Sequence, residues 1–137
     1  MVKEKQTFSK DERLSSRKLI EQVAKEGKSF LVHPFKVITL EVPTAIGTEI
    51  KYPAQVMMTA PKKRFPRAVD RNRIKRLMRE AYRKNKHTLY TALTEQNKKL
   101  AIMLIYVGAE LPEYKLAEDK IILILQRLSK QNEATAQ

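Results

Sequence analysis

Apolar residues recur at helical spacing in three segments of the chain, residues 16–26, 68–85 and 114–128, and each segment predicts an amphipathic helix. A shorter helical piece is expected at residues 86–96. Gly27 stands where the glycine that follows a helix C-terminus belongs, so the first helix should end just before it.

Three other segments have the length and composition of strands. Residues 35–42 are rich in β-branched and aromatic side chains, and residues 54–59 form a second candidate that ends before Pro61. The run at 101–107 is continuously apolar, which is typical of a buried central strand. Residues 43–53 contain Pro, Gly and Thr and predict a loop.

This order of elements predicts an α+β fold, in which helices pack on a small sheet. A length of 137 residues suits a single domain, residues 1–137, that can bury a core without metal or disulfide support. Ser9 and Glu12 have the spacing of a capping box, which predicts one helical turn near the N-terminus. We expect flexible ends at residues 1–13 and 129–137.

The composition excludes several classes of protein. The chain has no cysteine, so it has no disulfide framework, no zinc site built from cysteines and no cysteine nucleophile. Its N-terminus lacks the apolar centre of a secretory signal. The longest apolar run, residues 121–125, is far shorter than the roughly 18 residues that span a bilayer. We therefore expect a cytoplasmic protein.

The positive charge of the chain is concentrated in one segment. Residues 62–86 hold twelve Lys or Arg and two acids, a net charge of +10, while the whole chain carries +13. A local excess of this size attracts a polyanion, most often nucleic acid and less often anionic lipid.

Within this segment, the 68–85 helix separates an apolar side from a charged side. The apolar side is predicted to face the core and holds Ile74, Leu77, Met78 and Ala81, with Tyr82 at its margin. On the other side, Arg71, Lys75, Arg79 and Arg83 step from i to i+4 and form one ridge, which costs stability through like-charge repulsion. A solvated face is the usual explanation of a charged helix, but this one lacks the interleaved acids of such faces. Membrane binding is disfavoured because the core needs the apolar side, which has no Trp or Phe.

The residues at 68–83, AVDRNRIKRLMREAYR, resemble the signature of the bacterial ribonuclease P protein component. That signature is an Arg-Asn-Arg triplet, then Lys-Arg, then Arg-Glu-Ala-aromatic-Arg, and the chain has each part in this order. A Lys-Lys pair at 62–63 and the stretch KEGKSF at 25–30 agree with the family context. A weaker likeness covers residues 14–128.

The resemblance implies a fold and an activity. The fold is a small α/β sandwich with one sheet of about four strands, like the second domain of a small-subunit ribosomal protein, with a left-handed crossover around the basic helix against the usual right-handed rule. The activity is that of a protein cofactor, bound 1:1 to the catalytic RNA of ribonuclease P. The holoenzyme removes the 5′ leader of precursor tRNA by hydrolysis, with Mg²⁺ held through the RNA subunit and no cofactor bound by the protein alone.

The candidate RNA-binding residues lie on the signature helix and on the loop before it. They are Lys62, Lys63, Arg64, Arg67, Arg71, Asn72, Arg73, Lys75, Arg76, Arg79 and Arg83. Arginine suits phosphate because its planar fork can bind two oxygens at once, and lysine acts as a point charge.

The resemblance also implies a cleft that holds the single-stranded leader, and here the chain departs from the family. The corresponding positions fall at Ile20, Ala24 and Ile38, and none is aromatic as family members usually are. Stacking of an aromatic ring on a base contributes about 1–3 kcal/mol, so this contact is in question. Phe30, Phe35 and Tyr52 could replace it, although packing in the core or in a loop is the commoner role of such residues.

The sequence offers no catalytic group of its own. It has no DxD, HxH or HExxH motif, and its two histidines, His33 and His87, have no partner at the spacing of metal ligands. We therefore expect no catalytic residue and no metal ligand in this protein. Two alternatives to the cofactor remain: a general structured-RNA-binding protein without a ribozyme partner, and an autonomous metal-dependent nuclease, which would cleave alone.

Overall fold

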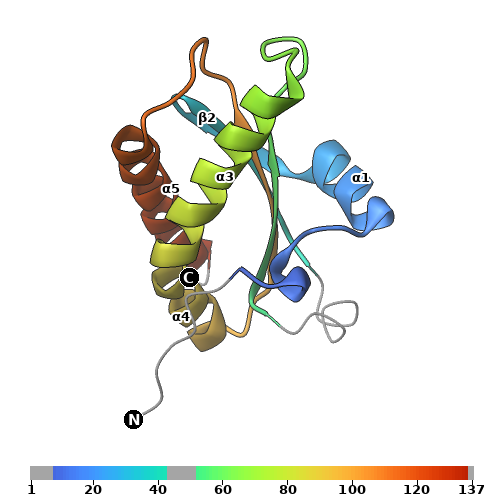
Figure 1. Ribbon diagram of the computed structural model, residues 1–137. Coiled ribbons are helices and arrows are strands. Elements are labelled where there is room, and N and C mark those ends of the chain that lie inside the picture. The colour runs from blue at the N-terminus through green and yellow to red at the C-terminus, as the bar shows by residue number, and fades with distance from the viewer. Residues whose placement is uncertain (1–7, 43–51, 136–137) are drawn as a thin grey trace.

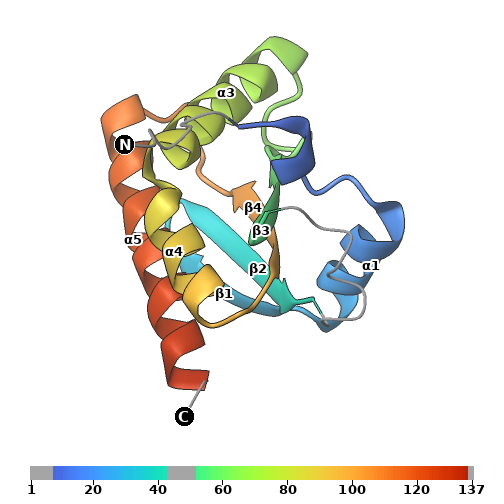
Figure 2. The same cartoon turned by 90° about the horizontal axis from the view of Figure 1, so that it is seen from below.

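The protein, described by a computed structural model, consists of one four-stranded sheet with helices on both faces (Figures 1 and 2). The structure describes residues 8–42 and 52–135, with side chains up to residue 130. This arrangement confirms the α+β sandwich with about four strands. The loop expected at 43–53 lies outside the described residues except at its last two positions.

The helices follow the sequence pattern closely. They are a 3-10 helix (Lys10–Glu12), α1 (Arg17–Glu26), α3 (Ala68–Asn85), α4 (His87–Glu95) and α5 (Tyr114–Thr135). The amide N–H of Leu19 donates to Ser16 Oγ, so Ser16 caps α1. Helix α5 continues past residue 128, where the pattern placed its end, because no Gly or Pro stops it there.

The strands are β1 (Lys28–Val32), β2 (Phe35–Glu41), β3 (Ala54–Thr59) and β4 (Leu100–Tyr106). Their order in the sheet is β1-β2-β4-β3. The β3–β4 pair is parallel and the other two pairs are antiparallel. Strand β4 is central, as its continuous apolar run predicts, whereas β1 is short, exposed at its start and absent from the predicted elements.

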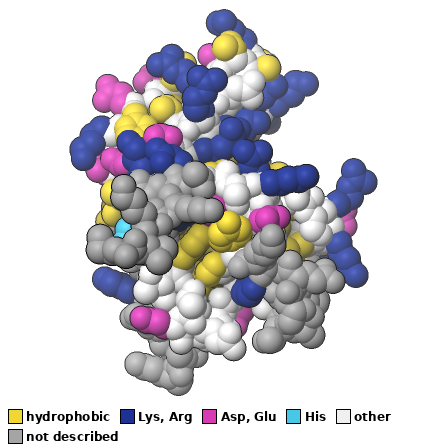
Figure 3. Space-filling view, turned by 60° about the horizontal axis from the view of Figure 1, so that its bottom comes forward, with side chains coloured by type: hydrophobic (Ala, Val, Ile, Leu, Met, Phe, Trp, Pro, Cys, Tyr) yellow, Lys and Arg dark blue, Asp and Glu magenta, His cyan; other side chains and the backbone are white. Residues whose placement is uncertain are grey.

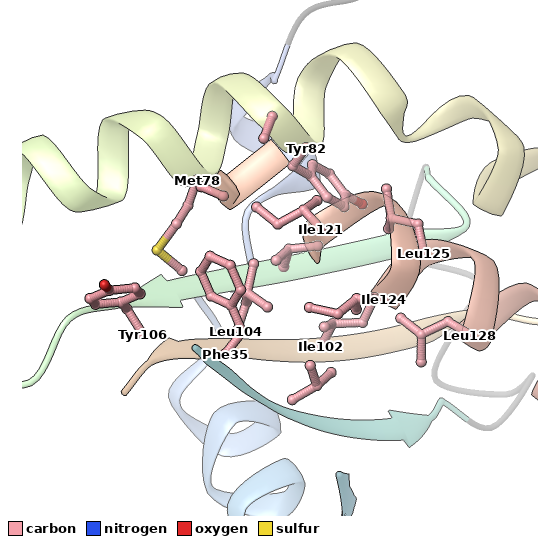
Figure 4. Packing of buried hydrophobic residues seen from close by; sticks show 14 of the residues in the cluster. Phe35, Met78, Tyr82, Ile102, Leu104, Tyr106, Ile121, Ile124, Leu125 and Leu128 are labelled. Carbon is pink, nitrogen blue, oxygen red and sulfur yellow. The ribbon is translucent and has the colours of Figure 1, made fainter. Parts of the chain in front are cut away.

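The main core lies between the sheet and helices α3, α4 and α5 (Figures 2 and 4). Met78 and Tyr82 of α3 point toward the sheet, and Ile121 and Leu125 of α5 meet them from the side. Tyr82 is 1% exposed, so it belongs to the core rather than to its margin, while Leu77 is only half-buried. The helix is thus turned slightly further toward Tyr82 than the wheel predicts.

Helix α1 covers part of the opposite face of the sheet, over a smaller cluster of Leu14, Val23, Val42 and Ala101. Gly27 ends α1 with an extended backbone at φ −67°, not with the left-handed conformation of the expected C-terminal glycine. A Cβ at this position would lie 2.4 Å from the carbonyl oxygen of Val23 and 2.7 Å from Ile38 Cγ2. Glycine is therefore needed for close packing of the helix end on β2.

The N-terminal segment runs along the edge of β3. The amide of Leu14 donates to the carbonyl of Val56 at 3.0 Å, and the side chain of Gln55 donates to the carbonyl of Asp11. Glu12, inside the 3-10 helix that the capping box predicts, is buried. Whether residues 1–13 and 129–137 are flexible stays a prediction.

Candidate nucleic-acid interface

We call the eleven candidate RNA-binding residues on α3 and the preceding loop the basic surface; its members run from Lys62 to Arg83. Ile74 and Met78 are fully buried and fix which side of α3 faces the sheet. As a result Asn72, Arg73, Arg76 and Arg79 are exposed on the other side. Figure 3 shows Lys and Arg side chains gathered over the upper part of the molecule, where α3 runs.

The loop before α3 presents four more cations. Its centre is anchored by Phe65, which is 6% exposed and whose ring lies 5.8 Å from that of Tyr106. The amides of Arg64 and Phe65 both donate to the carbonyl of Pro61, which closes a tight turn. The charged side chains around this anchor are all exposed: Lys62, Lys63, Arg64 and Arg67.

Arg71 differs from the other arginines of the basic surface. Its Nη1 donates to the carbonyl oxygens of Phe65 and Pro66, each at 2.8 Å, and the side chain is half-buried. Part of its hydrogen-bonding capacity therefore serves the protein's own backbone.

Arg83, at the other end of the ridge, is also engaged. Its Nη2 lies 2.5 Å from Glu80 Oε1 and its Nε 3.2 Å from Glu80 Oε2, a two-point ion pair. The hydrogen bond and charge of Arg83 hold the pKa of the Glu80 carboxyl below its usual value. In the like-charge ridge predicted from the sequence, Arg83 thus has a carboxylate partner and Arg71 has two backbone carbonyls. Lys75 and Arg79 have no side-chain partner among the described residues.

Eight cations of the basic surface have no side-chain hydrogen bond or ion pair with any residue that the structure describes. They are Lys62, Lys63, Arg64, Arg67, Arg73, Lys75, Arg76 and Arg79. A rigid helix and an anchored loop therefore present an array of uncompensated charge, which is suited to a chain of phosphates.

Lys86 contributes to the sequence charge of this segment but not to its surface. It is 5% exposed and forms an ion pair with Glu12, which is 1% exposed. The hydroxyl of Tyr90 donates to the same carboxylate at 2.6 Å and accepts from the hydroxyl of Tyr82 at 3.1 Å. The sequence analysis did not predict the ion pair of Glu12, because the capping box indicates only a local role for this residue.

The three residues proposed for the leader cleft lie on the opposite side of the sheet. Ile20 and Ile38 are half-buried and pack against the smaller cluster, whereas Ala24 is exposed on α1. In the register of the sheet, Ile38 is paired with Met103 of β4, and Met103 is paired with Met57 of β3, so the three side chains lie on the same face. The two methionines are also half-buried and extend this row, but the sequence analysis did not include them. The alternation of side chains along the strands at 54–59 and 101–107 would have placed them on this face.

None of the three aromatic substitutes lies in this row. Phe35 is fully buried in the main core, and Phe30 pairs with Val37 on the same side of the sheet, beneath the guanidinium of Arg127 at 4.1 Å. The ring of Tyr52 lies 6.4 Å from that of Tyr90. Packing, not exposure in a leader cleft, is the role that the structure gives these residues.

Comparison with known proteins agrees with this geometry. Residues 8–129 match the family model described as Ribonuclease P. The Ribonuclease P protein component of Porphyromonas gingivalis is 43% identical over 113 residues, which cover 81% of this chain and 78% of that protein. The one from Chlorobium phaeobacteroides is 32% identical over 130 residues, or 89% and 88% of the two chains.

Solved structures show the same fold. The ribonuclease P protein of Thermotoga maritima superimposes with a TM-score of 0.65 at 25% identity, covering 85% of this chain and 96% of that one. The Staphylococcus aureus protein gives a TM-score of 0.65 at 21% identity, covering 85% and 94%.

Proposed function

The chain belongs to the ribonuclease P protein family, and from this premise we propose that it is the protein cofactor of a ribonuclease P whose RNA subunit performs the cleavage. The family acts in tRNA processing within a ribonucleoprotein. In the proposal, the protein binds the catalytic RNA 1:1 and contacts the 5′ leader of precursor tRNA.

One observation carries this proposal: the eight cations that project from α3 and its loop without a partner in the described part of the chain. Holding them in one place costs stability through mutual repulsion. Phosphates of a bound RNA would relieve this repulsion and release their own counterions. The basic surface is therefore the face that we assign to the RNA subunit.

The proposed mechanism is electrostatic. Precursor tRNA and the catalytic RNA are both polyanions, and a cationic surface between or beside them offsets their repulsion, which lowers the magnesium concentration that cleavage requires. If about six phosphates are engaged, log affinity should fall against log salt with a slope of about −4 to −5.

Among the described residues, no three His, Asp or Glu side chains come together in a way that could hold a metal ion. In the proposal, Mg²⁺ is held through the RNA subunit and no residue of this chain has a catalytic role.

The leader is assigned to the sheet face beside α1. The row of Ile38, Met103 and Met57 gives that face an apolar strip, with Ile20 of α1 next to it in the smaller cluster. A methionine sulfur packs favourably on aromatic rings, so the strip can receive a base without an aromatic side chain. We expect weaker leader binding than stacking on an aromatic residue would give.

The proposal includes no membrane among the partners of this protein. Every helix in the described part of the chain is too short or too polar to span a bilayer. The proposal places the protein in the cytoplasm, together with its RNA partner and precursor tRNA.

Cleavage of precursor tRNA by a bacterial ribonuclease P RNA at low magnesium, with and without this protein, tests the proposal. We expect cleavage only when both are present. Salt-sensitive RNA binding without restored cleavage would instead indicate the general structured-RNA-binding protein. Cleavage by the protein alone would overturn the assignment of the chemistry to the RNA.

A further inference from the structure

Arg71 lies within the basic surface, but its hydrogen bonds point back to the protein. Both N–H groups of its Nη1 are used, one for the carbonyl of Phe65 and one for the carbonyl of Pro66, at 2.8 Å each. Arg73, two residues further along α3, is exposed and has no side-chain partner among the described residues. The same residue type therefore serves two different purposes within one turn.

The two carbonyls belong to the segment that connects the loop to α3. This loop has a turn on Pro61 at its start, and Phe65 at its centre packs against Tyr106. Its last part, from Pro66 to Arg67, is exposed, and the carbonyl of Arg67 accepts a hydrogen bond from the amide of Arg71 at 3.3 Å. The side chain of Arg71, one helical turn after Arg67, adds an attachment of the two preceding carbonyls to the helix.

A loop held in this way keeps its charged side chains near their bound positions before RNA arrives. Ordering a flexible loop upon binding costs free energy, and prior ordering removes that cost from the affinity. We propose that Arg71 is a positioning residue, which holds the loop at 61–67 in the form in which Lys62 and Lys63 meet RNA phosphates. The inference rests on the proposed function, since it takes the basic surface as the RNA-binding face.

The first test uses the free protein and no RNA. In Arg71→Ala, the amides of Arg64 and Phe65, which bond to the carbonyl of Pro61, should exchange with solvent about tenfold faster, because the loop opens more often. Arg73→Ala removes an equal charge without a backbone contact and should leave their exchange unchanged. Unchanged exchange in Arg71→Ala would overturn the proposal, since the loop would then not depend on Arg71.

The second test is a double-mutant cycle on RNA affinity at fixed salt. Arg71→Ala should weaken RNA binding about tenfold in the wild-type background but less than about twofold when Lys62 and Lys63 are already alanine, because the loop then has little left to position. Arg73→Ala, as a direct contact, should cause the same loss in both backgrounds.

Equal losses for Arg71→Ala in both backgrounds would make Arg71 an ordinary phosphate contact and overturn the proposal. A lowered urea midpoint with unchanged RNA affinity of the folded protein would overturn it as well, since Arg71 would then be merely structural. Failure of the wild type to prefer ribonuclease P RNA over another structured RNA would count against the proposed function. The exchange measurement, made without RNA, would still decide the role of Arg71.

Discussion

Glu12 and Lys86 form a buried ion pair that joins the N-terminal segment to the junction between α3 and α4, although 74 residues separate them in the sequence. Tyr90 adds a hydrogen bond to the same carboxylate, and the ring of Phe8 packs edge-on against Tyr82 at 5.6 Å. The C-terminal end of α3 is thus tied to the N-terminal segment.

Replacing Glu12 by Gln should destabilise the protein by about 3 kcal/mol, because it leaves the buried charge of Lys86 uncompensated. Urea unfolding measures this loss. The double variant Glu12→Gln/Lys86→Met, which removes both charges, should recover a substantial part of it. A single variant as stable as the wild type would show that the ion pair is not a net support of the fold.

The contribution of Glu12 should depend on pH. Burial raises the pKa of its carboxyl, but hydrogen bonds from Lys86, Ser9 and Tyr90 and the charge of Lys86 outweigh burial and hold the pKa below the usual 4.5. Because the unfolded chain binds this proton more readily, the stabilisation is complete above about pH 4.5 and is lost as pH falls through the folded-state pKa.

The measurement is the difference in free energy of unfolding between the wild type and Glu12→Gln over a range of pH. The difference should be constant near neutrality and shrink below pH 4.5. A difference that grows on acidification would mean that the pKa of Glu12 is raised in the folded protein.

Arg76→Ala and Arg79→Ala should each weaken binding of ribonuclease P RNA and reduce the salt slope by about 1, as expected for the loss of one phosphate contact. Both side chains are exposed, so the free energy of unfolding should change by no more than about 0.5 kcal/mol. Lys115→Ala on α5 removes a charge outside the basic surface and should leave RNA binding unchanged. Unfolding of either arginine variant would contradict the placement of these side chains on the outer face of α3.

Two adjacent methionines provide a matched pair of variants that tests the proposed assignment of the leader to the α1 side of the sheet. Met57 lies in the row on the α1 side of the sheet, while Met58 packs against the main core on the other side. Met57→Ala should lower the preference for precursor over mature tRNA by about 1 kcal/mol, at the low end for a base contact. Met58→Ala should reduce stability and leave that preference unchanged. Equal preferences in the two variants would exclude the α1 side as the leader site.

The sequence predicts α3 from residue 68 to residue 85 because a long helix repeats its apolar spacing many times, so the helix can be recognised from that segment alone. Strand β1 has only five residues, and its start is exposed, so neither periodicity nor an apolar run marks it. The same limit applies to Gly27, whose need for close packing depends on a strand that lies beneath it only in the folded protein.

In the candidate site, the charge of a residue does not predict which group it contacts. Counting residues places Lys86 and Arg71 with the other cations. In the structure, however, Lys86 pairs with a buried carboxylate, and Arg71 donates to two backbone carbonyls. Each pairing depends on the three-dimensional path of the chain, which the residue type does not reveal. The exposure of cations such as Arg76 is predicted correctly because their environment is solvent, whatever the fold around them, while their contact with RNA stays a prediction.

The parallel pairing of β3 with β4 has a consequence for folding kinetics. A parallel pair needs a crossover, and here the crossover consists of the loop, α3 and α4, so closing the β3–β4 pair also brings the most positively charged part of the chain against the sheet. Such a non-local closure is slow compared with helix formation. Repulsion among the cations adds to this barrier, so salt or a polyanion should speed refolding. The RNA to which the protein binds would then also speed the folding of the protein.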